Sequence, residues 1–292
     1  MMAKMRGHQT TMSELTPTDG TDAPVTFRSL RSAARELYAN RLILGNFVRR
    51  DFTSKHMNSF LGTLWSVLNP LLMVVVYSVV FQFVFRAAPK DISYPYAVFF
   101  FGGLVIWNLV GPTVQDASGS IVNNSFLIQK VYVPREIFPI SVVMGAGVTF
   151  IFELVVLAIF MVIFRVVPDW TIVLFPIFPV MAMLFSVGLG LFVSALNVRF
   201  RDVEHFIGVG VQLVFFLTPI LWSFSQFTNP TLARLLHLNP VSPMVSGFRD
   251  VVLDGRLPQW DWLGYSAIWI VGLLFFGYIF FNRQEPFFAE LT

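Results

Sequence analysis

Residues 139–164 read PISVVMGAGVTFIFELVVLAIFMVIF, a run of apolar and small residues that contains one charged group, Glu153. An α-helix needs about 20 residues to cross the roughly 30 Å hydrocarbon core of a bilayer. A segment of this length and composition therefore predicts a membrane-spanning helix. Much of the remaining chain follows the same pattern.

Six stretches have the length and the low charge that a span requires. They cover about residues 60–85, 96–115, 139–164, 172–197, 206–224 and 263–282. The overall composition agrees, because 55% of the 292 residues are hydrophobic and only 13% are charged, whereas a soluble domain carries roughly 25% charged residues. The sequence thus predicts an all-α integral membrane protein, with a transmembrane domain over residues 59–283.

The two ends of the chain have a different composition. Residues 1–24 are polar and are expected to form a disordered cytosolic tail. Residues 25–58 place Phe27, Leu30 and Leu37 at helical spacing between arginines, a pattern typical of an amphipathic helix at a membrane interface. Residues 284–292 are expected to form a cytosolic C-terminal tail.

The distribution of lysine and arginine predicts the orientation, because cytosolic loops are enriched in these residues. With both termini in the cytosol, the inside holds Arg28 through Lys55, Lys130, Arg135, Arg199, Arg201 and Arg283. The outside then holds Arg86, Lys90, Arg165, Arg234, Arg249 and Arg256. Residues 225–262, on the outside, contain apolar runs too short to span and broken by prolines, which predict short re-entrant helices before the last span.

The sequence lacks the residues of several kinds of active site. There is no cysteine, and the four histidines lie far apart, so no metal-ligand spacing is present. No phosphate-binding loop occurs, so we expect no ATPase site and no cofactor in this chain. Acidic residues are scattered singly rather than clustered, which argues against a metal-dependent membrane enzyme.

Glu153 is the one ionisable residue within a predicted span. An acid at this depth is costly and often functional. The alternative is a structural role, in which Glu153 is hydrogen-bonded between helices or lies near a wet cavity with no specific task. The sequence leaves both interpretations open.

Three ordered motifs carry a family resemblance. They are LGTLWSVLNPLL at residues 61–72, KVYVPREIFPI at residues 130–140, and NVRFRDV at residues 197–203, followed by Thr218-Pro219-Ile220, Leu238-Asn239-Pro240 and Phe248-Arg249. Over about residues 40–285 the chain resembles the ABC-2 type permeases that export polysaccharides and polyol phosphates, such as O-antigen, teichoic acid or galactan.

This resemblance implies a homodimer bound to two copies of a separate ATPase subunit, which would bind ATP and Mg²⁺. It implies a polyprenyl-pyrophosphate-linked glycan as substrate and a location in the cell (inner) membrane. By the same resemblance, the loop around residues 125–137 and the short loop at residues 199–205 would couple to the ATPase. The coupling candidates are Gln129, Lys130, Tyr132, Pro134, Arg135, Glu136, Arg199, Arg201 and Asp202.

The resemblance also places the first and fifth spans along the substrate channel. Aromatic side chains on or beside these spans are the candidate lining residues, because rings stack on the C–H faces of sugars. They are Trp65, Tyr77, Phe81, Phe215, Phe216 and Trp222. The alternative for each is packing against helices or lipid.

Three other functions remain as alternatives. The first is an ABC-2 exporter of another lipid or a drug. The second is a membrane enzyme that handles polyprenyl phosphate. The third is a channel or ion-coupled carrier, which would work without an ATPase partner.

Overall fold

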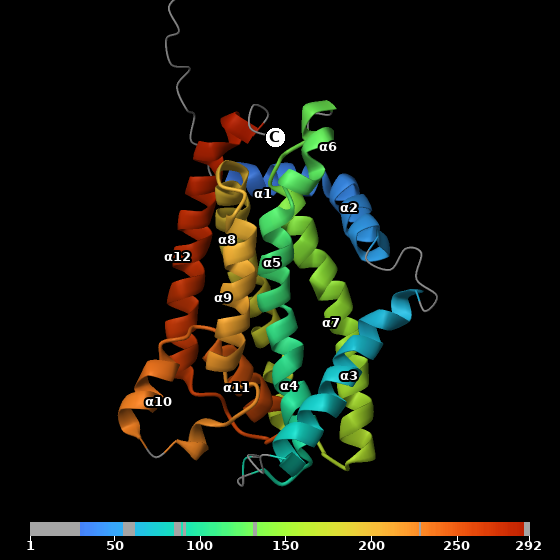
Figure 1. Cartoon of the computed structure of the whole chain (residues 1–292), viewed down its shortest axis with the longest axis vertical. Coiled ribbons are helices and arrows are strands. Elements are labelled where there is room, and N and C mark those ends of the chain that lie inside the picture. Colours follow the sequence, from blue (N-terminus) through green and yellow to red (C-terminus); the bar gives the residue numbers. More distant parts are fainter. Residues whose placement is uncertain are drawn as a thin grey trace, which may run out of the picture.

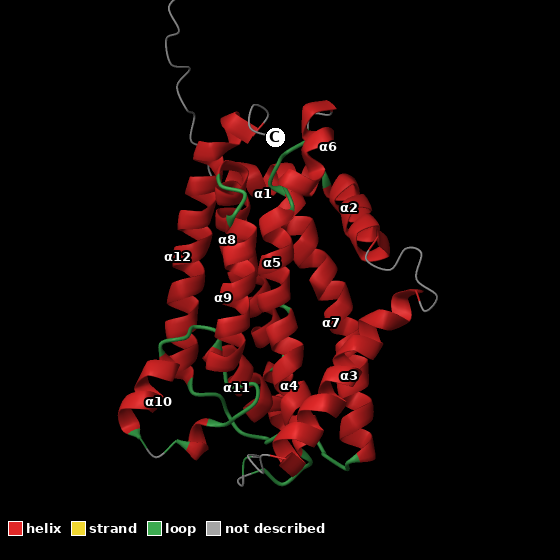
Figure 2. Ribbon diagram, in the orientation of Figure 1, coloured by secondary structure: helices red, strands yellow, loops and turns green. Residues whose placement is uncertain are grey.

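The computed structural model describes residues 30–54, 62–84, 89, 92–130, 133–227 and 229–288. Figure 2 shows helices joined by loops throughout this part of the chain, with no strand among the described residues. The fold class predicted from hydropathy is therefore confirmed as all-α.

Long helices run side by side and form the body of the molecule (Figure 1). The chain order is α3 (Trp65–Ser78) continued by the π-helix η2 (Val79–Val84), α4 (Tyr96–Asn108), α5 (Gly111–Gly119), α7 (Ile137–Ile163), α8 (Ile177–Arg199), α9 (Val203–Leu217) and α12 (Trp260–Gln284). The short helices are α6 (Ser125–Lys130), α10 (Pro230–His237) and α11 (Ser242–Val252).

Among the described residues, four helical segments are long and apolar enough to cross a membrane, namely Tyr96–Gly119, Ile137–Ile163, Trp170–Arg199 and Trp260–Phe287. Two further apolar segments, Leu68–Val84 and Val203–Leu217, are shorter. At 1.5 Å per residue they measure about 25 Å and about 22 Å, less than the ~30 Å hydrocarbon core. They correspond to the predicted first and fifth spans, and the count of six crossings stays a prediction.

The fifth predicted span was expected to reach residue 224, but α9 ends at Leu217. The reason is local. Thr218 precedes Pro219 and has an extended backbone, with φ −90° and ψ 141°, because proline disfavours the helical conformation in the residue before it. The following residues form a loop with the short 3-10 helix η5 (Phe224–Gln226).

The predicted N-terminal amphipathic region contains two helices, α1 (Leu30–Ala39) and α2 (Arg41–Ser54). They are separated at Asn40, whose side chain donates a hydrogen bond of 2.9 Å to the Glu36 carbonyl. Residues 25–29 and 55–58 of this region lie outside the described residues. Figure 1 places α1 and α2 at the same end of the molecule as α6 and the C-terminal end of α12.

The core of the molecule surrounds α4. Tyr96, Phe100, Phe101 and Ile106 of this helix are at most 2% exposed. The helix is apolar on all sides, as expected for a helix enclosed by others. Helices α3, α7 and α11 pack around it.

Helices α8 and α12 pack closely through a pair of glycines. A Cβ atom at Gly188 of α8 would lie 2.7 Å from the Leu274 nitrogen of α12. A Cβ atom at Gly277 of α12 would meet the Gly188 carbonyl oxygen. Small residues allow helix backbones to approach closely in membranes, where packing drives helix association.

We expect Gly277→Ala to destabilise the protein, because the added methyl group must push two backbones apart. Overpacking of this kind typically costs about 1–3 kcal/mol. Thermal unfolding in detergent measures the effect. The matched control is Gly272→Ala in the same helix, where nothing lies within 4 Å of the added Cβ. Equal melting temperatures for the two variants would contradict the close-packing account.

Candidate functional site

A cavity with a volume of about 730 Å³ lies between α3, α4, α5 and α9. Two kinds of side chain dominate its lining. Aromatic rings come from Tyr77, Phe100, Trp107, Phe215 and Phe216, and carboxamides come from Asn69, Asn108, Gln115 and Gln212. We call this space the central cavity.

The rings of the central cavity form a continuous cluster. Tyr77 of α3 lies 5.0 Å from Phe100 of α4 and 6.0 Å from Phe215 of α9, measured between ring centroids. Trp107 lies 5.7 Å from Phe215. Three helices thus contribute to one aromatic wall, and offset or edge contacts at these separations are favourable.

One polar group of the central cavity is hydrogen-bonded to the protein behind it. The Asn108 side chain donates a hydrogen bond of 2.7 Å to a carboxyl oxygen of Glu153 in α7. Glu153 is only 2% exposed and does not line the cavity itself. The structure thus shows a hydrogen bond between helices, made by a residue that faces the cavity, and the functional role of Glu153 stays a prediction.

A second, polar cavity of about 490 Å³ adjoins the first and shares Gln115 and Glu204 with it. We call it the vestibule. It lies toward the end of the molecule that holds α2, and its remaining lining includes Arg50, Asp51, Asp116, Ser120, Asn123 and Asn124. Arg50 pairs with Asp51 at 2.9 Å and donates a hydrogen bond of 2.8 Å to the Asn124 side chain.

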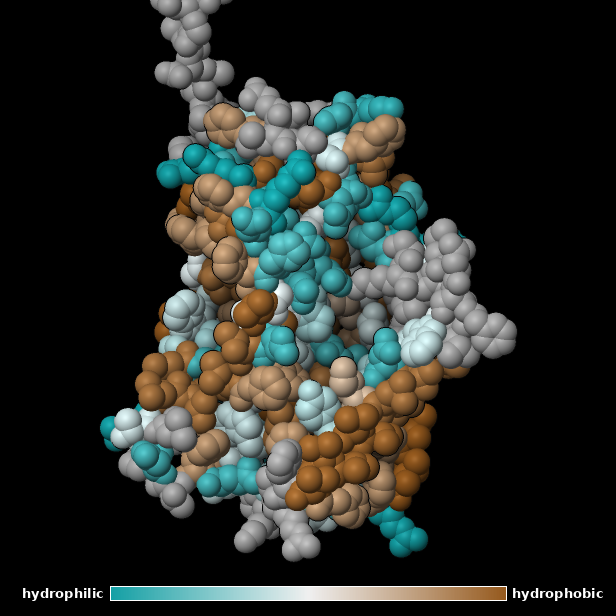
Figure 3. All heavy atoms as spheres, viewed as in Figure 1, coloured by the Kyte–Doolittle hydropathy of each residue, from teal (hydrophilic) through white to brown (hydrophobic). Residues whose placement is uncertain are grey.

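Figure 3 shows the same division on one face of the molecule. Hydrophilic residues gather over the upper and middle part of this face, which is hollowed near its centre, whereas hydrophobic residues cover the lower right, over α3. A polar, hollowed surface beside apolar helices is what a passage for a hydrated substrate across a bilayer requires.

The six aromatic residues predicted to line a channel separate into two groups. Tyr77, Phe215 and Phe216 line the central cavity, and Phe81 stacks on Tyr77 at 6.1 Å. Phe81, Trp65 and Trp222 are not among the lining residues. Trp222 packs against Phe224 and Phe227 in the loop that follows α9.

The carboxamides were missed, although one signal was present in the sequence. His205, Gly208, Gln212 and Phe215 recur at spacings of three and four residues, which places them on one face of α9. This polar stripe within an apolar helix marks the side that faces the cavity.

The predicted coupling residues also fall into two groups. Gln129 and Lys130 at the end of α6, and Arg199, Arg201 and Asp202 at the α8–α9 turn, are exposed. Pro134 and Glu136 are buried, and the Arg135 side chain donates a hydrogen bond to the Glu285 carbonyl beyond the end of α12. Tyr132 lies outside the described residues.

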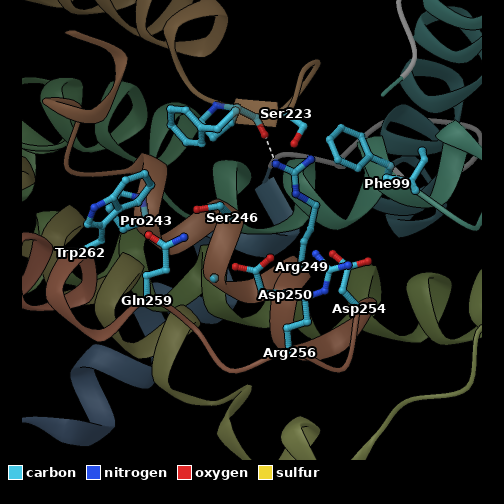
Figure 4. Close-up of a pocket in the computed structure, with 14 residues that line it drawn as sticks. Phe99, Ser223, Pro243, Ser246, Arg249, Asp250, Asp254, Arg256, Gln259 and Trp262 are labelled. Carbon is cyan, nitrogen blue, oxygen red and sulfur yellow. Dashed lines mark hydrogen bonds between the residues drawn. The ribbon is translucent and has the colours of Figure 1, made fainter. Parts of the chain in front are cut away.

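At the opposite end of the molecule, a pocket of about 180 Å³ surrounds Arg249 of α11 (Figure 4). The Arg249 guanidinium lies 3.8 Å from the centre of the Phe99 ring and donates a hydrogen bond to the Pro219 carbonyl. This side chain therefore ties α11 both to α4 and to the break after α9. Its other terminal nitrogen, Nη1, is buried without a partner among the described residues.

Two acids accompany Arg249 in this pocket. Asp254 accepts a hydrogen bond of 3.0 Å from the Tyr94 hydroxyl. Burial, and secondly the charge of Asp254, raise the pKa of Asp250 to about 6. With Arg256 also in the lining, the pocket balances two bases against two acids.

Apolar helices, several of them long enough to cross a bilayer, and a cavity lined by aromatic rings and carboxamides define a polytopic membrane protein with a site suited to a polar substrate. The ABC-2 type transporter family matches residues 44–253, and this chain belongs to that family. It is accordingly the membrane subunit of a transporter and not an enzyme.

The curated relatives point to one kind of cargo. The O-antigen export system permease protein RfbA of Myxococcus xanthus is 31% identical over 87% of this chain and 96% of its own length. A protein of the same name from Klebsiella pneumoniae is 29% identical over 83% and 92%. The polysialic acid transport protein KpsM of Escherichia coli is 21% identical over 83% and 93%.

We expect Arg249→Met to loosen α11 and the loop after α9, because the Pro219 carbonyl and the Phe99 face lose their partner. Removing a buried charged side chain and leaving its hydrogen-bond partner unpaired typically costs about 2–4 kcal/mol of stability. Amide hydrogen exchange should rise across residues 218–252. The control is Arg256→Met, since Arg256 is exposed. Unchanged exchange in the Arg249 variant would show that this side chain does not hold the segment.

Proposed function

We propose that this chain is the permease of an ATP-driven exporter that moves a polysaccharide, carried on a polyprenyl-pyrophosphate lipid, from the cytosolic to the outer leaflet of the inner membrane. The observation that carries the proposal is the central cavity. Its rings match the apolar C–H faces of sugars, and its carboxamides donate to and accept from hydroxyl groups. The names of the relatives support the same cargo.

The proposal includes a homodimer with six spans in each copy. Helices α3 and α9, whose apolar segments are shorter than the hydrocarbon core, flank the central cavity and expose large apolar side chains that do not line it, such as Val75 and Val76 on α3 and Leu213 and Leu217 on α9. Helices shorter than the bilayer are better suited to an interface between copies than to lipid. Pairing of these faces would place two central cavities on either side of one passage.

The energy source in the proposal is a separate ATPase, present in two copies, which binds ATP and Mg²⁺. Its docking surface comprises the exposed end of α6 and the exposed α8–α9 turn, which project from the end of the molecule that we assign to the cytosol together with both termini. Arg135 and Glu136, which are packed inward, would transmit the motion toward α12 rather than touch the ATPase.

At the external end, α10 and α11 would form a re-entrant pair that closes the passage between export cycles. Their lengths of 8 and 11 residues are too short to span. The buried contacts of Arg249 would hold the pair in its closed position.

Depletion of this protein in its own host tests the function. We expect a lipid-linked polysaccharide to accumulate at the cytosolic face of the membrane and to disappear from the cell surface. Accumulation of a different lipid or a drug, with normal surface polysaccharide, would contradict the proposed cargo.

Complementation of the depleted strain tests the coupling surface in the same assay. A variant that carries both Arg199→Glu and Arg201→Glu should reach the membrane at normal levels but restore little export, since reversed charges weaken docking. Arg234→Glu, an exposed substitution in α10 at the other end, should restore export fully. Full export by the double variant would refute the coupling assignment.

A further inference from the structure

The described lining of the central cavity contains no lysine and no arginine. Its one acidic side chain is Glu204, at the junction with the vestibule, and His205 lies next to it. The other polar side-chain groups in the described lining are uncharged, namely the carboxamides, the Tyr77 hydroxyl and the Trp107 indole N–H. A site that recognises carboxylate or phosphate groups normally supplies arginine or lysine to pair with them.

The group hydrogen-bonded behind Asn108 adds no positive charge to the cavity. Asn108 separates the cavity from the Glu153 carboxyl group, to which its side chain is hydrogen-bonded at 2.7 Å. Whether Glu153 is ionised or protonated, it contributes either a negative charge or none. An acidic group that moved past Asn108 would therefore find no counter-ion there.

The vestibule does hold one arginine, but its charge is compensated. Arg50 pairs with Asp51 at 2.9 Å, and Asp116 and Glu204 line the same space. Among the described residues that line the path from the vestibule to the central cavity, Arg50 is the one arginine or lysine, and it is already paired. Such a path attracts anions weakly and leaves uncharged molecules unaffected.

From this charge pattern, and resting on the proposed function, we infer that the exported glycan is built from sugars without carboxylate or phosphate groups. The inference concerns the sugar chain that passes through the cavity, not the pyrophosphate of the carrier lipid. It favours a neutral polysaccharide and excludes acidic cargo such as polysialic acid or a teichoic-acid-like polyol phosphate.

The test compares two fluorescently labelled oligosaccharides of equal length. One is a linear glucose oligomer and the other an oligomer of sialic acid, which carries one carboxylate per sugar. Binding to the complex of this chain with its ATPase, reconstituted in nanodiscs, is measured at low and high salt. We expect the glucose oligomer to bind equally at both salt concentrations. At low salt, where charge repulsion is least screened, the acidic oligomer should bind at least about tenfold more weakly than the glucose oligomer.

Two variants test whether the cavity causes this preference. Gln212→Lys adds a positive charge at an exposed position of the lining, and Glu204→Gln removes a negative one. Each should strengthen binding of the acidic oligomer. If the lysine variant does not fold, Glu204→Gln still tests the inference. Thr231→Lys adds the same charge on α10, outside the cavity, and should change neither affinity.

Two results would overturn the inference. The first is binding of the acidic oligomer to the unaltered complex as tight as that of the glucose oligomer. The second is an unchanged preference in both cavity variants. If neither oligomer binds the unaltered complex or any variant, the proposed function itself fails. This result differs from tight binding of the acidic oligomer, which would overturn only the inference about charge.

Discussion

A polar side chain within a bilayer must be hydrogen-bonded or face water, because an unpaired polar group in hydrocarbon costs several kcal/mol. This constraint accounts for the arrangement of the molecule. Glu153 is paired with Asn108 between α7 and α4. Asn108 itself lies at the wall of the central cavity, together with Gln115 and Gln212. These three carboxamides thus mark the wall of one cavity.

The same constraint explains the contrast between the two sides of the short helices. The carboxamides and rings of α3 and α9 face the central cavity, while other apolar side chains of the same helices, such as Val75 and Val76 of α3 and Leu213 and Leu217 of α9, are exposed and do not line it. Helices α8 and α12 behave differently. They are long enough to span and pack together through Gly188 and Gly277. The molecule therefore combines a tightly packed pair of long helices with a pair of short helices around a cavity.

The sequence predicts the helical spans well, because hydropathy follows directly from composition. It is less informative about what each helix faces. Trp222 and Phe215 are both aromatic residues near the end of the fifth span, yet only Phe215 lines the central cavity. The break at Pro219 separates them, and Trp222 donates a hydrogen bond of 3.0 Å to the Phe216 carbonyl. Hydropathy does not distinguish the two residues, since their environments depend on tertiary contacts.

Contacts between residues far apart in the sequence were also not predictable from the sequence. Asn108 and Glu153 are 45 residues apart in the sequence, and no local sequence pattern predicts that they are in contact. Arg135 was expected on a docking surface, but its contact with the Glu285 carbonyl, 150 residues away, turns it inward. By contrast, the polar stripe of α9 was readable from spacing alone, because helical periodicity is a local property.

The absence of cysteine from the 292 residues allows a direct measurement on the central cavity. A single thiol is introduced by Gln212→Cys, and its labelling by a water-soluble maleimide is followed in membranes that contain the exporter and its ATPase. Our account predicts rapid labelling in the idle exporter and protection when a non-hydrolysable ATP analogue stalls a polysaccharide in transit, whereas Thr231→Cys is labelled equally in both states. Equal labelling of position 212 with and without stalled polysaccharide would contradict the claim that the glycan passes through this cavity.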